Sequence, residues 1–127
     1  MRLNHVTVGV RDINRAADFY LRLGLRQIVA DDHYARFVCP DGDATFSIER
    51  TEAVASGTVV YFECDDLDAQ VARLRERGIV FDSDPADQPW LWREARCRDP
   101  DGNRICFYAA GRNRLHPPWE LVPPREV

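Results

Sequence analysis

An internal repeat is the feature that most limits what this chain can fold into. Residues 3–25 and 57–79 follow one pattern, in which Asp12 corresponds to Asp66. In each copy apolar residues first alternate with polar ones, then recur at helical spacing after the Asp, and a Gly closes the pattern. The Asp suits a helix N-cap and the Gly a helix C-terminus. The repeat therefore predicts two equivalent modules, each beginning with a strand and a helix.

Two turn motifs extend the prediction beyond the helices. Residues 39–43 read CPDGD and residues 99–103 read DPDGN, so both carry Pro, Asp and Gly in the order of a tight turn. Such turns reverse the chain between antiparallel strands, which we expect at residues 34–38, 44–50, 90–98 and 104–109. One more strand is expected after each helix, near residues 26–30 and 79–81. Each module then reads strand–helix–strand–strand–strand, an α+β arrangement.

The length of 127 residues, of which 45% are apolar, is typical of one small globular domain. We expect that domain over residues 1–110, with module 1 at about residues 1–53 and module 2 at about residues 57–110. Residues 111–127 hold four prolines and show no periodicity. They predict a Pro-rich C-terminal tail that packs along its own domain, along a partner subunit, or against another protein.

Charge and residue usage exclude several classes of function. The net charge of −4 gives no electrostatic support for binding nucleic acid or an anionic membrane, and no apolar run is long enough to span a bilayer. All 17 basic residues are Arg, so a Schiff-base lysine, a pyridoxal phosphate lysine and a P-loop lysine are impossible. The four cysteines form no C-x-x-C pair and are expected to be free thiols. We therefore expect a soluble, cytoplasmic protein.

The doubled unit, the opening LNHVTVGVRDINRAADFYLRLGL and the late DPDGNRICFY together resemble the vicinal oxygen chelate (VOC) superfamily. That superfamily includes glyoxalases, extradiol dioxygenases, epimerases, and fosfomycin- and bleomycin-resistance proteins. The resemblance implies a glyoxalase-like fold, in which two tandem βαβββ modules form a curved mixed sheet around a cavity, often completed in a homodimer. In metal-dependent members, side chains from the first and last strands of each module bind one divalent ion.

Strand alternation predicts which side chains face such a cavity. If Val6, Val8 and Val10 face the helix, the residues between them face the other way. The same alternation in the other strands gives an inward-facing set of His5, Thr7, Ser47, Glu49, Val59, Tyr61, Cys106 and Tyr108. Trp90, Trp92 and Arg93 are expected to form one wall or lid, because two alternating tryptophans offer a flat apolar surface. The alternative for the tryptophans is to seal the sheet or a dimer contact.

The resemblance also implies where metal ligands would stand. His5 occupies the place of the first ligand, but Val59 occupies the place of the second and has no lone pair to donate. Cys106 stands where metal-dependent relatives carry Glu, and the remaining position falls on Ser47, or on Glu49 if the strand shifts by two residues. A catalytic metal normally needs three protein ligands and an open position. The family metal centre is therefore expected to be incomplete.

We expect a VOC-fold homodimer that binds a small organic ligand in a cavity between its modules without the full metal centre. Sequestration or transport is then its role, and no catalytic residue is assigned. The alternative is a metal-dependent lyase, isomerase or dioxygenase that uses an altered site of His5, Glu49 and Cys106 around a divalent ion. The sequence does not name the ligand, since pocket shape depends on loops that alternation does not define.

Overall fold

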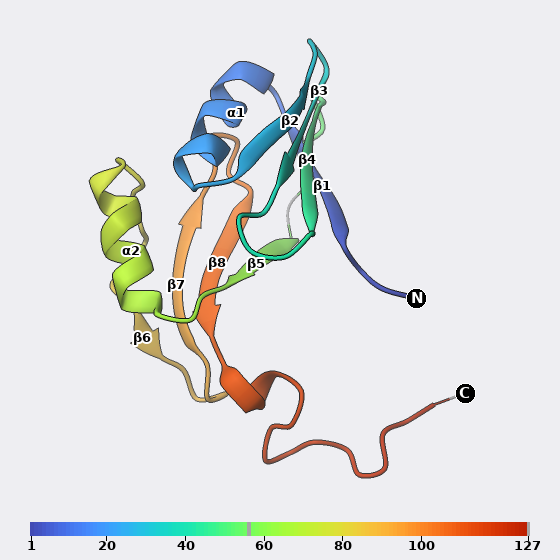
Figure 1. Cartoon of the computed structure of the whole chain (residues 1–127), viewed down its shortest axis with the longest axis vertical. Helices are drawn as coiled ribbons and strands as arrows, with labels where there is room; N and C mark the ends of the chain where they lie inside the picture. Colours follow the sequence, from blue (N-terminus) through green and yellow to red (C-terminus); the bar gives the residue numbers. More distant parts are fainter. Residues whose placement is uncertain (56, 127) are drawn as a thin grey trace.

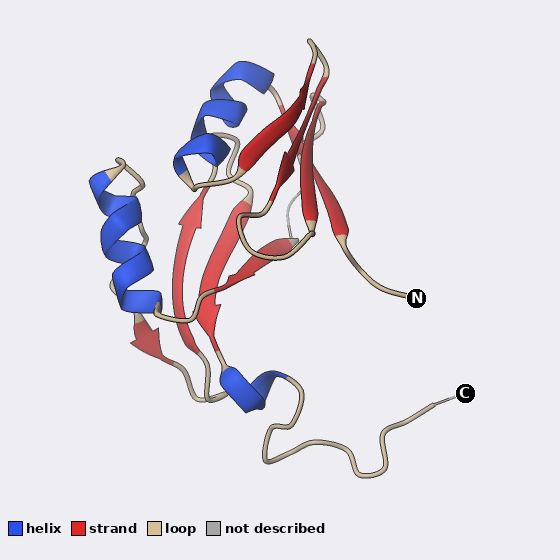
Figure 2. Cartoon of the chain, viewed as in Figure 1, coloured by secondary structure: helices blue, strands red, loops and turns tan. Residues whose placement is uncertain are grey.

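The computed structural model describes residues 1–55 and 57–126 and contains two four-stranded sheets (Figures 1 and 2). The first sheet has the strand order β1-β4-β3-β2 and the second has the order β5-β8-β7-β6. The first module consists of β1 (His5–Val10), α1 (Ile13–Arg22), β2 (Arg26–Ala30), β3 (Tyr34–Val38) and β4 (Thr45–Arg50). The second consists of β5 (Val59–Glu63), α2 (Leu67–Glu76), β6 (Ala86–Asp87), β7 (Arg93–Arg98) and β8 (Arg104–Ala109), followed by the 3-10 helix η1 (Gly111–Arg114).

Both sheets are mixed, because β1 runs parallel to β4 and β5 runs parallel to β8 while the remaining pairs are antiparallel. This confirms the predicted α+β class. The sheets are open, and within residues 1–55 and 57–126 strand pairing joins strands only within each set of four. In Figure 1 each helix lies to the left of the sheet of its own module, α1 beside β2 and α2 beside β7.

The repeat is visible in the helices. Helix α1 begins at residue 13 and α2 at residue 67, and both have 10 residues. The Asp12 carboxylate accepts from the backbone N–H of Arg15 at 3.0 Å, and Asp66 accepts from Ala69 at 3.1 Å, so both predicted N-caps are confirmed. The closing Gly24 has a φ of 100°, which only glycine adopts readily.

The second module departs from the repeat between α2 and β7. The two helices begin 54 residues apart in the sequence. The equivalent last strands, β4 from residue 45 and β8 from residue 104, begin 59 residues apart. The predicted strand at residues 79–81 is wrong, because Phe81 makes only an isolated bridge to Cys97 and the edge strand is β6. The strand predicted from residue 90 begins at 93, because Leu91 adopts a φ of 67° in a turn.

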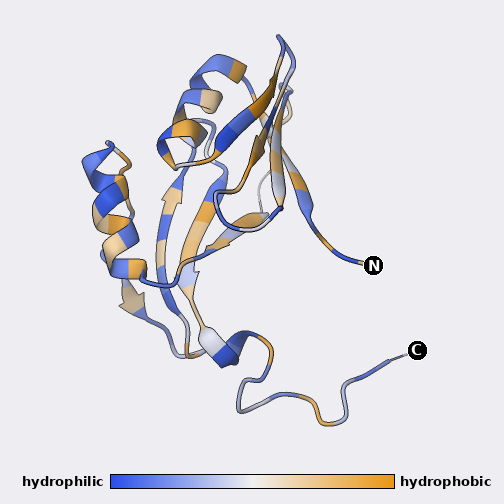
Figure 3. Cartoon of the chain, viewed as in Figure 1, coloured by the Kyte–Doolittle hydropathy of each residue, from blue (hydrophilic) through white to orange (hydrophobic). Residues whose placement is uncertain are grey.

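One hydrophobic core joins the two modules. Apolar side chains from both helices and from the helix-facing side of both sheets form a single cluster, and Figure 3 shows apolar and polar residues alternating along these elements. Phe46 of the first module packs against Phe62 of the second, with ring centroids 6.3 Å apart. Because the modules share this core, each depends on the other for burial of its apolar face.

A buried polar contact also links the modules at the turn between β7 and β8. Asp99 is 4% exposed, and its carboxylate accepts from the Tyr20 hydroxyl of α1 at 2.7 Å. Its other partners are the side chain of Asn103 and the backbone N–H groups of Asp101 and Asn103. The Asn103 amide also donates to the carbonyl of Gly9 at 2.8 Å. The predicted turn therefore also docks the second module onto the first.

Residues after η1 leave the sheets and extend along the bottom of the molecule in Figure 1. Their apolar side chains Leu115, Trp119, Leu121 and Val122 are 57–84% exposed. These four side chains are thus not covered by their own domain. None of the described helices combines the length and the apolar character needed to cross a membrane.

Candidate functional site

We call the side of each sheet opposite its helix the inner face. On the first inner face, defined by His5, Thr7, Thr45, Ser47 and Glu49, a histidine meets three hydroxyl groups. The Nδ1 atom of His5 is hydrogen-bonded to Thr45, while its Nε2 atom lies 3.2 Å from Ser47 Oγ. Thr7 Oγ1 lies 2.6 Å from Ser47 Oγ and 3.3 Å from the same Nε2. Strand alternation predicted that His5, Thr7 and Ser47 share a face, and the contacts confirm it.

Tyr34 and Arg36 of β3 complete this face. Glu49 is exposed and lies opposite Tyr34 of β3 in the strand register. Hydrogen bonds with Ser47 and Arg36 lower the pKa of the Tyr34 hydroxyl. The sequence reasoning missed Tyr34 and Arg36, although alternation along residues 34–38 would have found them.

The second inner face carries an aromatic cluster. Trp92 stacks on Tyr108 with centroids 4.5 Å apart and an interplanar angle of 19°. The Tyr61 ring stands edge-on to both, with centroids 5.9 Å from Trp92 and 5.7 Å from Tyr108. Cys106 is fully buried in the same cluster as Tyr108, and Val59 packs against this cluster. These residues therefore form a flat apolar surface whose accessible edge is Tyr61, which is 43% exposed.

A buried carboxylate adjoins the aromatic cluster. Glu94 is 5% exposed and accepts from the indole N–H of Trp90 at 2.9 Å and from Arg96 at 3.4 Å. Arg96 also donates to the Tyr61 hydroxyl at 3.2 Å. The sequence reasoning missed Glu94 and Arg96, although both follow Trp92 at alternating positions of one strand. Together these groups offer a ligand hydrogen-bonding partners beside an apolar surface.

Arg93 lies apart from this group. Its guanidinium reaches Asp68 of α2 at 3.0 Å and Asp87 of β6 at 3.1 Å. It therefore turns to the helix side, as expected for the neighbour of an inward-facing Glu94. The other predicted positions fall into two groups, with His5, Thr7, Ser47 and Glu49 on the first sheet and Val59, Tyr61, Cys106 and Tyr108 on the second.

The donor groups do not fit the metal centre implied by the family resemblance within one chain. Both ring nitrogens of His5 are engaged by hydroxyl groups, and Cys106 belongs to the other sheet. Across residues 1–55 and 57–126, no three His, Cys, Asp or Glu side chains come together as a set that could hold an ion. Hydroxyl groups are weak neutral ligands compared with the imidazole and carboxylate ligands that catalytic metals use.

The thiols of the second module have raised pKa values. Burial, with a smaller contribution from Glu94, raises the pKa of Cys106 to about 12. Burial and the Asp82 carboxylate raise the pKa of Cys97 to about 12 as well. Since these values exceed the ordinary thiol pKa of about 8.5, ionisation favours the unfolded chain. The resulting stability is intact below about pH 8.5 and is lost as the pH rises toward 12.

We therefore expect Cys97 and Cys106 to resist Ellman's reagent in the folded protein at about pH 8, because only the thiolate attacks. Cys39 and Cys64 are half-buried, and burial raises the pKa of Cys39 and raises the pKa of Cys64 to about 11, so Cys39 should react first and Cys64 after it. Absorbance of the released product counts the reacting thiols before and after addition of urea. Immediate reaction of all four thiols without urea would contradict the burial described here.

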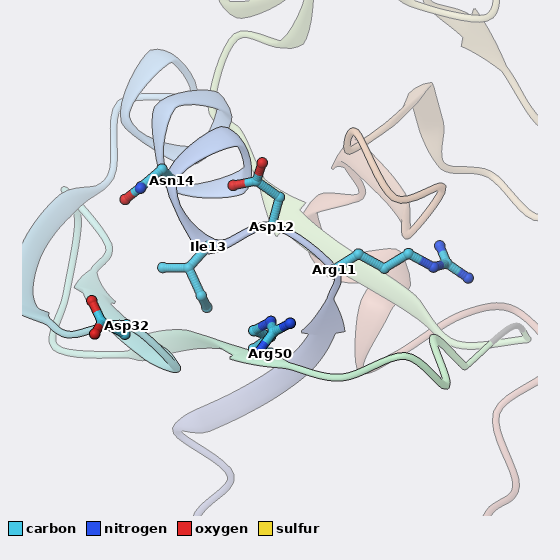
Figure 4. A pocket seen from close by; sticks show the side chains of 6 residues that line it. All are labelled: Arg11, Asp12, Ile13, Asn14, Asp32 and Arg50. Atoms are coloured by element: carbon cyan, nitrogen blue, oxygen red, sulfur yellow. The ribbon is translucent and has the colours of Figure 1, made fainter.

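Two surface pockets are lined by residues outside the aromatic cluster. The first, of about 250 Å³, is at the start of α1, where Figure 4 shows Arg11 extending away from the other labelled side chains. It carries charges of both signs, and its Asp12 carboxylate already caps the helix. The second pocket, of about 420 Å³, is lined by Ala55, Gly57, Thr58, Arg98, Gly102 and Arg104.

Comparison with solved structures gives the same fold. A glyoxalase/bleomycin resistance protein/dioxygenase from Nocardioides is 24% identical, with a TM-score of 0.77 over 95% of this chain and 89% of that one. A lactoylglutathione lyase from Agrobacterium tumefaciens is 20% identical (TM-score 0.70, 85% of this chain and 92% of that one). TioX from Micromonospora sp. ML1 is 22% identical (TM-score 0.69, 87% and 99%). No curated protein matches the sequence.

The sequence profile of one family covers most of the chain. It matches residues 2–107, which include both helices, strands β1 to β7 and four of the six residues of β8. The profile and the repeated strand–helix–three-strand modules therefore agree. This chain belongs to the Glyoxalase/Bleomycin resistance protein/Dioxygenase superfamily.

Proposed function

We propose that this protein binds a small organic molecule with a planar apolar part, in a hollow bounded by its inner faces. The observation that carries the proposal is the Trp92–Tyr108 stack, with the accessible Tyr61 ring at its edge. A planar ligand that covers Tyr61 and Trp92 gains apolar burial and ring contacts. The Tyr61 hydroxyl and the Arg96 guanidinium then orient its polar groups.

A second copy of the chain is the proposed cover of this hollow. In the single chain Tyr61 and Trp90 are more than 40% exposed. Large apolar groups left open in this way are typical of surfaces that meet a partner. We propose a homodimer working in the cytoplasm, where the reducing environment suits four free cysteines. Its mass in solution, measured by light scattering, tests the dimer.

The proposed role needs no metal ion, because the His5 cluster is complete with hydroxyl partners. After incubation with Zn²⁺, Ni²⁺, Mn²⁺ and Fe²⁺ followed by desalting, we expect far less than one ion per chain. His5→Ala should leave that amount unchanged. Stoichiometric metal that disappears in His5→Ala would favour the metal-dependent alternative with Glu49 and Cys106.

Tryptophan fluorescence tests ligand binding directly. Titration with a panel of small planar aromatic compounds should give saturable quenching for at least one of them. The quenching should persist in Trp119→Phe, which changes only a tail residue that is 57% exposed. It should decrease in Trp92→Phe, in which Trp90 beside Glu94 remains as a fluorophore, while calorimetry still detects binding. Absence of saturable binding by every compound at millimolar concentration would refute the proposal.

A further inference from the structure

Two arginines face each other across neighbouring strands at one end of the second inner face. Arg98 of β7 and Arg104 of β8 are register partners, and Arg104 also pairs with Val59 of β5. Paired residues place their side chains on the same side of a sheet. Alternation then puts both arginines on the side that carries Tyr61 and Cys106.

The positive charge of this pair has no acidic partner in the part of the chain that is described. No carboxylate of residues 1–55 or 57–126 forms a salt bridge with Arg98 or Arg104. Asp99 and Asp101, which lie between the two arginines in the sequence, are engaged elsewhere. Asp99 binds Tyr20, and Asp101 binds the arginines at residues 11 and 15. Like charges directly opposite in a sheet are destabilising, so this pair costs stability without an anion.

The pocket in front of the pair has room for an oxyanion. Its volume is about 420 Å³, and its other walls are the small residues Ala55, Gly57, Thr58 and Gly102. A methyl group added at Gly102 would meet no atom within 4 Å, so this wall is open. Guanidinium groups present planar pairs of donors that match a carboxylate or a phosphate.

We infer that Arg98 and Arg104 form a subsite for the oxyanion group, carboxylate or phosphate, of the organic ligand. This inference rests on the proposed function and names the class of its ligand. Cys106, which pairs with Tyr61, is two residues beyond Arg104 on β8, and Tyr108 is four residues beyond it. At a rise of about 3.3 Å per strand residue, Cys106 and Tyr61 lie about 7 Å along the strand from Arg104, and Tyr108 lies about 13 Å from it. An aromatic acid or aryl phosphate spans the first distance, with its ring against Tyr61 and its anion on the arginines.

Calorimetry on the full chain tests this subsite with probes that share one ring system. The probes are an aromatic carboxylate, its uncharged carboxamide, the corresponding aryl phosphate, and inorganic phosphate alone. We expect one of the two anionic aromatics to bind about tenfold or more tightly than the carboxamide, with affinity falling as salt rises. The tighter of the two identifies the oxyanion that the subsite prefers.

The variants are Arg98→Gln, Arg104→Gln and the double substitution, with Arg73→Gln on α2 as a control of equal charge change. Each single variant should weaken the anionic probe about tenfold and leave the carboxamide unchanged. Unfolding in urea checks that the variants fold, and removing the like-charge pair should not lower their stability.

The outcomes separate the two proposals. If carboxamide and anion bind alike and the double variant changes neither, the subsite is refuted and the proposed function stands. If no aromatic probe binds but inorganic phosphate binds and is lost in the double variant, the subsite stands and the proposed function fails.

Discussion

Asp99→Ala is expected to lower the free energy of unfolding by about 3 kcal/mol or more, since it removes the acceptor of several buried donors. The Tyr20 hydroxyl is fully buried and has the Asp99 carboxylate as its partner at 2.7 Å. Two backbone N–H groups and the Asn103 amide would lose the same acceptor. The substitution also loosens the contact between the modules. Urea denaturation monitored by circular dichroism measures the change.

Two matched variants show how much of that loss belongs to each hydrogen bond of Asp99. Tyr20→Phe removes one donor and should cost about 1–2 kcal/mol. Asp99→Asn keeps one acceptor oxygen and should fall between Tyr20→Phe and Asp99→Ala, so it remains measurable if the alanine variant does not fold. A midpoint for Asp99→Ala equal to that of the unaltered protein would show that the contact does not join the modules.

Trp92→Ala is expected to weaken binding of a planar ligand about 100-fold, because the central ring of the cluster is lost. Trp92 contacts Tyr108 face to face and Tyr61 at the edge, and its indole N–H donates to the carbonyl of Asn113. Its removal should also cost about 2–3 kcal/mol of stability. Calorimetric titration with a compound identified by fluorescence measures the affinity, and urea denaturation measures the stability.

Trp119→Ala is the control, because it removes the same side chain from the exposed tail. It should change neither the affinity nor the free energy of unfolding. Equal binding by Trp92→Ala and the unaltered protein would remove the observation on which the proposed function rests.

Most of the secondary structure followed from the sequence because its signals are local. The caps at Asp12 and Asp66 and the turn at residues 99–103 depend on side chains that bond to their own neighbourhood. Alternation likewise predicted that Thr7 and Ser47 share one face, since side-chain direction in a strand has a fixed period.

The prediction failed where the second module departs from the repeat. The residues by which the second module is longer than the first lie within 79–92. No local signal there showed that Phe81 would make a single bridge or that β7 would begin at residue 93. Glu94, Arg96 and Arg98 were missed for a different reason, since alternation from Trp92 along the predicted strand already places all three on the inner face. The sequence reasoning also placed Arg93 with the site, although that side chain pairs with Asp68.

The sequence by itself determined the two modules, their helix caps and the side of each strand that turns away from the core, because each follows from contacts within a few residues. Tertiary structure alone decided that Tyr20 would meet Asp99, that Trp92 would stack on Tyr108 and that Arg98 would stand opposite Arg104. These pairs depend on strand register and on how two modules dock. Register and docking minimise the free energy of the whole core, to which residues far apart in the chain contribute together.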